Sequence, residues 1–137
     1  DLAWSRGLGD VYKRQCKISQ IGSLRQGESL GYSRSFVAES ATQYATLPVG
    51  YADGLSRSLS NGKGAVYIRG VRCEILGNVC MDMCMVSIAG LKVKEGEEVE
   101  LLGPLQSANA MAKDAGTISY EVMTGIGSRV PRLYLKD

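Results

Sequence analysis

The chain has 137 residues, a length that suits one compact domain with its own hydrophobic core. Hydrophobic residues make up 45% of the chain and charged residues 22%, which is typical of a globular protein and excludes intrinsic disorder. The 16 basic and 14 acidic residues leave a formal net charge of +2 with no basic block, so we expect no nucleic-acid partner.

The apolar stretches of the chain are short, and histidine is absent. Glycine or charge interrupts each stretch well before the roughly 20 apolar residues that a membrane helix needs, and no signal-peptide region opens the chain, so we expect no membrane segment here. Four cysteines without a secretory signal favour reduced thiols and a cytoplasmic location. The lack of histidine excludes Ser-His-Asp and Cys-His nucleophiles.

Residues 1–15 show no sustained helix or strand period, and their character differs from that of the residues after them. We therefore expect them to be a foreign leader outside the fold, such as adaptor read-through. The domain itself is predicted to cover residues 16–137.

From Cys16 onward, short runs rich in Val, Ile, Thr and Tyr alternate with glycine-containing turns about every 8 to 12 residues. This pattern predicts a mainly β fold, a Greek-key-like β-barrel or sandwich. The predicted strands cover residues 17–21, 30–38, 44–49, 65–68, 71–76, 83–88, 98–102 and 129–134. Arg69-Gly70 is expected to connect two of them as a hairpin, because glycine supplies the positive φ of primed turns. Asn61-Gly62 indicates another turn.

Two short helices are predicted near the carboxy terminus, before the last strand. Ser107 is expected to cap a helix over residues 108–115, and Gly116 to end it. Thr117 and Glu121 fit the first turn of a second helix.

Four segments carry side chains that could take part in catalysis or binding. Residues 50–54, Gly-Tyr-Ala-Asp-Gly, place a phenol and a carboxylate on a loop. Residues 77–82 form a second loop, Gly31-Tyr32 lies in a predicted strand, and Tyr120 lies where a helix start could attract an anion. Taken one at a time, each segment is better explained by turn formation or packing.

The cysteine spacing does not indicate a metal site. Cys80 and Cys84 are four residues apart, but structural zinc usually takes four soft ligands in two close pairs. Cys16 and Cys73 lie at irregular distances, and no histidine is available, so we expect no metal and interpret the cysteines as core thiols.

The order of the four segments is more specific than any one of them. Together they resemble the carboxy-terminal domain of alanine racemases over about residues 16–137. The four matching segments are Gly31-Tyr32 with Phe36, residues 47–54, Gly77 with Cys80-Met81-Asp82, and residues 117–121; a terminal signature, Arg129-Val130-Pro131-Arg132-Leu133-Tyr134, also matches. The spacings are also near those of the family, including 19 positions from Tyr32 to Tyr51.

The resemblance implies an enzyme that interconverts L- and D-alanine with pyridoxal phosphate. That cofactor would be held as a Schiff base by a lysine of an amino-terminal eight-stranded barrel, and no lysine of this chain has that context. The lysine would be one base and Tyr32 the other, since inversion needs a base on each face of the planar carbanion. A phenol ordinarily has a pKa of about 10, so nearby groups must lower it.

The resemblance also assigns roles to other residues and implies partners. Tyr51 would stand at the active-site entrance, the Met81 backbone N–H would meet the substrate carboxylate, Asp82 would support the site, and Tyr120 would bind the cofactor phosphate. The family forms a head-to-tail homodimer in which Tyr32 would act in trans on the second subunit's barrel. The implied product, D-alanine, supplies peptidoglycan precursors, and the chain alone is expected to be inactive.

The chain departs from the family pattern at two positions, and two alternatives stay open. Ser33 stands where many members have Gly, and Phe36 where many have Tyr. A non-catalytic β-barrel binding module is one alternative, because residues 93–103 resemble turns in translation-factor barrels; such a module would not need the three motifs together. The same domain of a serine/alanine racemase, with or without a membrane tether, is the other.

Overall fold

The computed structural model describes residues 2–5, 12–118, 121–122 and 132–135. The strands are β1 (Leu2–Ser5), β2 (Tyr12–Lys17), β3 (Gln20–Leu24), β4 (Ser29–Leu30), β5 (Phe36–Val37), β6 (Thr42–Leu47), β7 (Ala65–Ile68), β8 (Val71–Leu76), β9 (Cys84–Ser87), β10 (Glu98–Leu102) and β11 (Arg132–Leu135). The helices are the α-helix α1 (Ala108–Ala115) and the short 3-10 helices η1 (Tyr32–Arg34), η2 (Tyr51–Asp53) and η3 (Arg57–Leu59).

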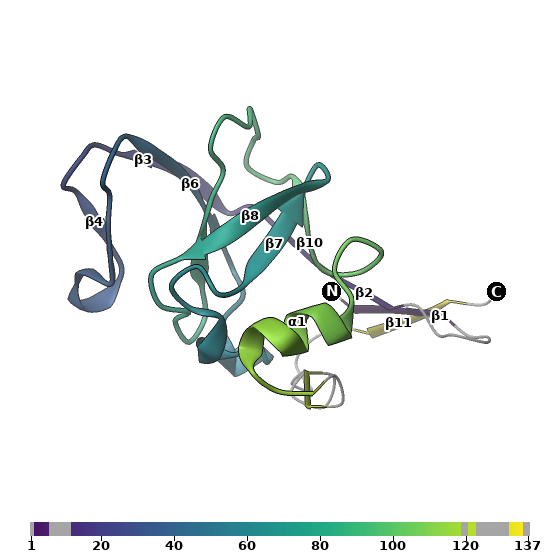
Figure 1. The fold of residues 1–137 in the computed structure, drawn as a ribbon. Coiled ribbons are helices and arrows are strands. Elements are labelled where there is room, and N and C mark those ends of the chain that lie inside the picture. The colour runs from purple at the N-terminus through teal and green to yellow at the C-terminus, as the bar shows by residue number, and fades with distance from the viewer. Residues whose placement is uncertain (1, 6–11, 119–120, 123–131, 136–137) are drawn as a thin grey trace.

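Nine strands form one curled sheet in the order β11-β1-β2-β10-β7-β8-β9-β6-β3, and β4 pairs with β5 in a separate ribbon (Figure 1). The pairs are antiparallel apart from the parallel pair of β1 and β11. The mainly β, barrel-like fold predicted from the sequence is confirmed.

One continuous stretch of chain contributes strands to two distant parts of the sheet. Its first half, β2, pairs with β10, and its second half, β3, pairs with β6. The change of partner falls at Ile18, whose N–H donates to Glu97 O at 3.0 Å, and at Ser19, whose N–H donates to Thr46 O at 3.0 Å. The sheet therefore curls around a closed interior.

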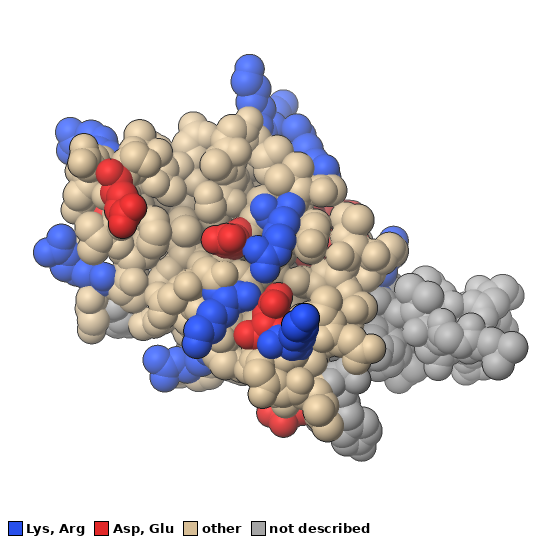
Figure 2. Space-filling view, viewed as in Figure 1, with Lys and Arg blue, Asp and Glu red and all other residues tan. Residues whose placement is uncertain are grey.

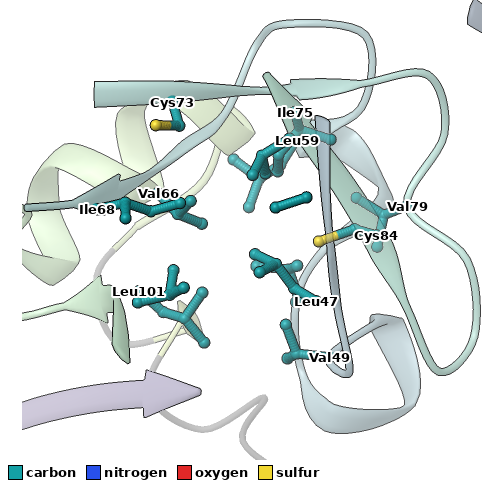
Figure 3. Packing of buried hydrophobic residues seen from close by; sticks show 14 of the residues in the cluster. Leu47, Val49, Leu59, Val66, Ile68, Cys73, Ile75, Val79, Cys84 and Leu101 are labelled. Atoms are coloured by element: carbon teal, nitrogen blue, oxygen red, sulfur yellow. The ribbon is translucent and has the colours of Figure 1, made fainter. Parts of the chain in front are cut away.

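The hydrophobic core fills the inside of this curl (Figure 3). Along β8, Cys73 and Ile75 are buried while Arg72 and Glu74 are exposed, which is the two-residue period of a strand with one face inward. The largest fully buried side chains are Leu47, Leu55, Leu59, Ile68, Ile75, Ile88, Leu101, Leu102, Val66, Val79 and Val86. The curl thus encloses one apolar interior.

Helix α1 covers one side of the barrel next to η3. Ser107 Oγ accepts a hydrogen bond from the Ala110 N–H at 3.1 Å, and Gly116 ends the helix with φ +74. Arg72 Nη2 of β8 lies 3.7 Å from Asp114 Oδ2 of α1, and both side chains are partly exposed. Basic and acidic side chains are interspersed over the face of the molecule that Figure 2 shows. The predicted helix and both of its end signals are confirmed.

Three predicted strands have the bounds that the sequence indicated, namely residues 65–68, 71–76 and 98–102. The Arg69-Gly70 hairpin is also confirmed, with φ values of +51 and +77, as is the Asn61-Gly62 turn with +58 and +81. The strands predicted at 44–49 and 83–88 exist as β6 and β9 with shifted ends.

Two predicted strands are wrong. Residues 30–38 do not form one strand, because Gly31, Ser33 and Arg34 have φ of +80, +56 and +54 and fold the chain into η1 between β4 and β5. Residues 17–21 span the point where β2 ends and β3 begins. Strong local alternation of apolar and polar residues favoured a continuous strand in each segment, so neither bend was predicted.

The first residues and the last lie partly in the sheet. Strand β2 starts at Tyr12 and β1 covers Leu2–Ser5, so the sheet begins before the domain start expected at residue 16; the foreign origin of residues 1–15 stays a prediction.

Of the second predicted helix, residues 121–122 are helical, with the Val122 N–H bonded to Ile118 O at 3.3 Å. Thr117 and Ile118 are described and are not helical, so the helix does not start at Thr117 as predicted; residues 119–120, and positions 129–131 of the last predicted strand, lie outside the described residues.

Within the described part of the chain, no helix combines the length and apolarity that a membrane crossing requires.

Candidate functional site

The loop after β6 lies against the loop after β8. The Tyr51 N–H donates to Cys80 O, and the Ala52 N–H donates to Met81 O, both at 3.0 Å. These two backbone bonds hold η2 on the second loop. They bring Tyr51 and Met81, which the sequence assigned to one site, into adjacent positions.

Gly50 makes this close approach possible. A Cβ at this position would lie 2.2 Å from Cys80 O and 2.4 Å from Met81 O, which is closer than real Cβ atoms come to another atom. The φ of Gly50 is −148, which any residue adopts, so glycine is needed here for space. The absence of a side chain lets the two loops touch.

Asp53 stabilises the turn from within. Its Oδ2 accepts a hydrogen bond from the Gly50 N–H at 3.1 Å, and its carbonyl oxygen accepts one from the buried Arg14 of β2. Gly54 then ends η2 with φ +93. The carboxylate of the Tyr-Ala-Asp-Gly loop therefore holds the turn that presents Tyr51.

The surface of the joined loops is aromatic and apolar. Tyr51 is 44% exposed, Met81 54% and Met83 46%. The Arg57 guanidinium carbon lies 6.0 Å from the centroid of the Tyr51 ring, at the edge of cation–π range. Asp82 is exposed between the two methionines. Such a cluster of exposed apolar side chains is typical of a surface that another chain or domain covers.

The turn that carries Tyr32 lies beside the same second loop. The Asn78 N–H donates to Ser35 Oγ at 3.2 Å, directly after η1. A Cβ at Gly77 would lie 3.3 Å from Phe36 Cβ, so the two segments also touch through Phe36. The structure describes the backbone of Tyr32 in η1, and this backbone belongs to the group of loops around Met81.

A cavity of about 270 Å³ opens beside Tyr51. Its wall comes from η2, η3, α1 and the segment after α1, and it is lined by Tyr51, Gly54, Ser56, Ser58, Leu59, Met111, Ala115, Thr117, Glu121 and Val122. Thr117 Oγ1 bonds to Glu121 Oε2 at 2.8 Å at its edge. The segment predicted to hold Tyr120 thus borders the cavity, although Tyr120 itself lies outside the described residues.

Three of the four cysteines have thiols whose pKa is raised by burial. All four are free, and Cys73 and Cys84 are buried in the core (Figure 3). Burial raises the pKa of the Cys84 thiol, and the neighbouring Cys16 and Cys80 raise it further. Burial likewise raises the pKa of Cys16 to about 11. Neutral buried thiols are poor nucleophiles, and among the described residues no group of three or more His, Cys, Asp or Glu could hold a metal ion.

The described residues do not hold pyridoxal phosphate by themselves. A cofactor bound through an amine needs a lysine inside an enclosed pocket. Every lysine that the structure describes is exposed, and none of them lines the cavity beside Tyr51. None of the described lysines therefore has the setting that such a cofactor needs.

Sequence reasoning missed two residues of this region, Ser35 and Arg57. Ser35 stands within a predicted strand, where a serine carries no special signal. Arg57 follows Tyr51 by six positions, and only the consecutive turns η2 and η3 bring its side chain back over the ring. Neither contact follows from a local pattern.

The fold and the loops define a barrel-like β-domain whose candidate site lies on loops at the ends of strands. A family model for the alanine racemase C-terminal domain matches residues 11–134. The chain belongs to this alanine racemase C-terminal domain family, as the order of motifs predicted.

Relatives and solved structures agree with the family. Alanine racemase of Geobacter sulfurreducens is 40% identical over 98% of this chain and 37% of its own length. Alanine racemase 1 of Clostridium acetobutylicum is 43% identical over 95% of this chain and 35% of its own length. The chain therefore spans about a third of the length of these relatives.

The structural neighbours show the same coverage. The alanine racemase of Bartonella henselae, solved with covalently bound pyridoxal phosphate, has a TM-score of 0.84 and 34% identity over 92% of this chain and 35% of its own. The alanine racemase of Clostridium difficile has a TM-score of 0.85 and 37% identity over 92% of this chain and 33% of its own. The fold of this domain is therefore that of the corresponding third of these enzymes.

Proposed function

We propose that the chain acts as the C-terminal domain of a pyridoxal-phosphate-dependent alanine racemase and supplies Tyr32 as one of the two bases. The observation that carries the proposal is the joining of three loops by hydrogen bonds at one place. Tyr51 N–H to Cys80 O and Asn78 N–H to Ser35 Oγ bring together the segments that the family order singles out.

The roles within the site follow from these positions. The cofactor, held by a barrel domain, would supply the electron sink that makes the α-proton of alanine removable. Tyr32 would exchange that proton on one face of the substrate, with groups of the barrel lowering the pKa of its phenol. The Met81 N–H would bind the substrate carboxylate, and Asp82 would support this loop.

Tyr51 and Tyr120 would act at the borders of the site. Tyr51 is nearly half exposed at the mouth of the cavity, a position that suits an entrance residue. Tyr120 would contact the cofactor phosphate from the segment that borders the same cavity. The exposed Tyr51, Met81 and Met83 would be covered by the barrel domain of a second subunit in a head-to-tail homodimer.

Two finer proposals concern substrate and location. Alanine is the substrate because the relatives carry that name, whereas a serine/alanine racemase would share the same domain; one hydroxyl is a small difference for an apolar pocket. A non-catalytic binding module is disfavoured, because the family match covers residues 11–134. Four free thiols suit a reducing cytoplasm, where D-alanine would enter peptidoglycan synthesis.

A racemase assay tests the proposal. This chain is incubated with L-alanine and pyridoxal phosphate, alone and with the separately expressed barrel half of the Geobacter sulfurreducens relative, and D-alanine is measured. We expect activity in the mixture, none from the chain alone, and a loss of about 10²–10⁴-fold with Tyr32→Phe, because proton transfer by a positioned base contributes that much. An inactive mixture of two halves that fold and associate would refute the proposal.

A further inference from the structure

Ser35 lies between the turn that carries Tyr32 and the loop that carries Met81. Its Oγ accepts a hydrogen bond from the Asn78 N–H at 3.2 Å, across 43 positions of sequence. Ser35 directly follows η1, and Asn78 opens the stretch that leads to Met81. One side-chain bond therefore joins the segment of the proposed base to the segment of the proposed carboxylate binder.

Two glycines make room for the Ser35 hydroxyl. A Cβ added at Gly31 or at Gly77 would lie 2.6 Å from Ser35 Oγ in either case. Both glycines also have positive φ, +80 and +65, so a side chain would be strained as well as crowded. The hydroxyl thus occupies a slot formed by both segments.

The loop after β8 is itself fixed to the barrel. The Val79 N–H donates to the buried Ser60 Oγ at 2.8 Å, and the Asn61 N–H donates to Gly77 O at 2.7 Å. Beyond them, Cys80 accepts the bond from η2. The loop has bonds on both sides of Asn78, so it is the rigid partner of the Ser35 contact, and the Tyr32 turn is the segment that the contact positions.

We propose that Ser35 is a positioning residue, which fixes the Tyr32 turn relative to the Met81 loop and so sets the distance between the base and the substrate carboxylate. This inference rests on the proposed function. Two groups that act on one small substrate must keep a defined separation, and misplacement by about 1 Å can cost about a hundredfold in rate. Loss of one hydrogen bond that leaves the turn in place costs less, about five- to tenfold.

The link is tested first on the chain itself, by amide hydrogen exchange. Ser35→Ala removes the acceptor, and we expect the Asn78 amide to exchange about tenfold faster. Ser35→Thr keeps an acceptor and should restore the protection. Ser23→Ala, an exposed serine on β3, is the matched control and should change nothing. An Asn78 amide that exchanges equally in Ser35→Ala and the unaltered chain would overturn the inference.

The positioning role is then tested by kinetics on the mixture with the barrel half. We expect Ser35→Ala to lower kcat five- to tenfold with KM within about twofold, and Ser35→Thr to recover most of it. The primary isotope effect with α-deuterated alanine should rise for only the enantiomer from which Tyr32 takes the proton. Unchanged kcat, or isotope effects that rise equally for both enantiomers, would refute positioning. An inactive mixture without any substitution would instead refute the proposed function.

Discussion

Gly50 is the residue at which two site loops come closest, and its role is steric. The carbonyl oxygens of Cys80 and Met81 occupy the space where a Cβ would lie. Any larger residue must therefore push η2 away from the second loop. The bonds that place Tyr51 beside Met81 would be the first to lengthen.

Substitution of Gly50 by Ala should damage both stability and activity. Overpacking of this kind lowers the free energy of unfolding by about 1–3 kcal/mol, and we expect racemase activity of the mixture to fall more than tenfold. Gly90→Ala is the control, since its φ is +79 and nothing lies within 4 Å of the added Cβ. It should cost about 1 kcal/mol through backbone strain and leave activity intact. Urea unfolding and the racemase assay measure both; full activity in Gly50→Ala would contradict the steric account.

The buried thiol of Cys84 makes the free energy of unfolding depend on pH in the alkaline range. Its pKa in the folded chain is raised above the ordinary value of 9.0 by burial, so the folded state keeps a proton that the unfolded state loses. The stabilisation is fully present below pH 9 and is lost as pH rises from there toward the folded pKa. Within that window, one proton corresponds to about 1.4 kcal/mol per pH unit.

Urea unfolding between pH 7.5 and 10.5 measures this effect. The free energy of unfolding should fall above pH 9 in the unaltered chain, and the fall should be shallower by about 1.4 kcal/mol per pH unit in Cys84→Val. Cys16 and Cys73, whose pKa values burial also raises, are present in both proteins, so the difference between the two profiles reports Cys84. Identical pH profiles would show that the Cys84 thiol does not hold its proton on folding.

At the scale of elements, Gln106 ties α1 to the sheet. The residue is 4% exposed, and its Nε2 donates to Ala65 O of β7 and to Leu101 O of β10, both at 2.8 Å. The Gly103 N–H also bonds to the Gln106 carbonyl at 2.9 Å. This side chain holds the turn before α1 against two strands, and α1 in turn walls the cavity beside Tyr51.

Gln106→Leu keeps the volume but removes the donor, so two buried carbonyl oxygens lose a partner. We expect the free energy of unfolding to fall by about 2 kcal/mol. Gln20→Leu, at an exposed position on β3, should change it by less than about 0.5 kcal/mol. Chemical denaturation compares the two variants; equal stabilities would mean that the two bonds contribute nothing net.

The elements also show which features a sequence can predict. Strands β7, β8 and β10 and helix α1 were predicted with their observed bounds, because alternation, a two-residue turn and end caps are local signals. The strand predicted at 30–38 was wrong, because Ser33 and Arg34 have left-handed backbone conformations. The neighbouring Ser35 accepts a hydrogen bond from Asn78, a contact 43 positions along the chain that no local pattern indicates. The hydrogen bonds of Gln106 could not be predicted for the same reason, since its partners lie in strands that only the fold brings near.

The candidate site follows the same division. The resemblance assigned Tyr32, Tyr51, Met81 and Asp82 to one site; hydrogen bonds join the segments that carry them, and the roles of the four residues stay a prediction. Ser35, which joins two of these loops, had no local signal, and Gly50 belonged to a recognised motif whose sequence did not reveal its steric role. Motif order identifies what a site contains, whereas close approach and hydrogen bonding across loops determine how it is held.

At the scale of the molecule, the sheet of this domain curls through one continuous segment that contains β2 and β3. The site loops of the domain face outward with exposed apolar side chains. The chain spans about a third of its relatives, and its described lysines are all exposed. In the proposed two-base mechanism, one base would belong to this chain and the other to the amino-terminal barrel domain. The central claim is that Tyr32 serves one face of the substrate.

Deuterium exchange tests this claim most directly. The mixture of chain and barrel half is incubated in D₂O with each alanine enantiomer, and α-deuterium incorporation is measured together with inversion. With Tyr32→Phe, the account predicts that inversion stops while one enantiomer still exchanges its α-proton with retention, because the other base keeps working on its own face. Loss of exchange from both enantiomers in a folded, associated mixture, or continued inversion, would contradict the assignment of Tyr32 as a base.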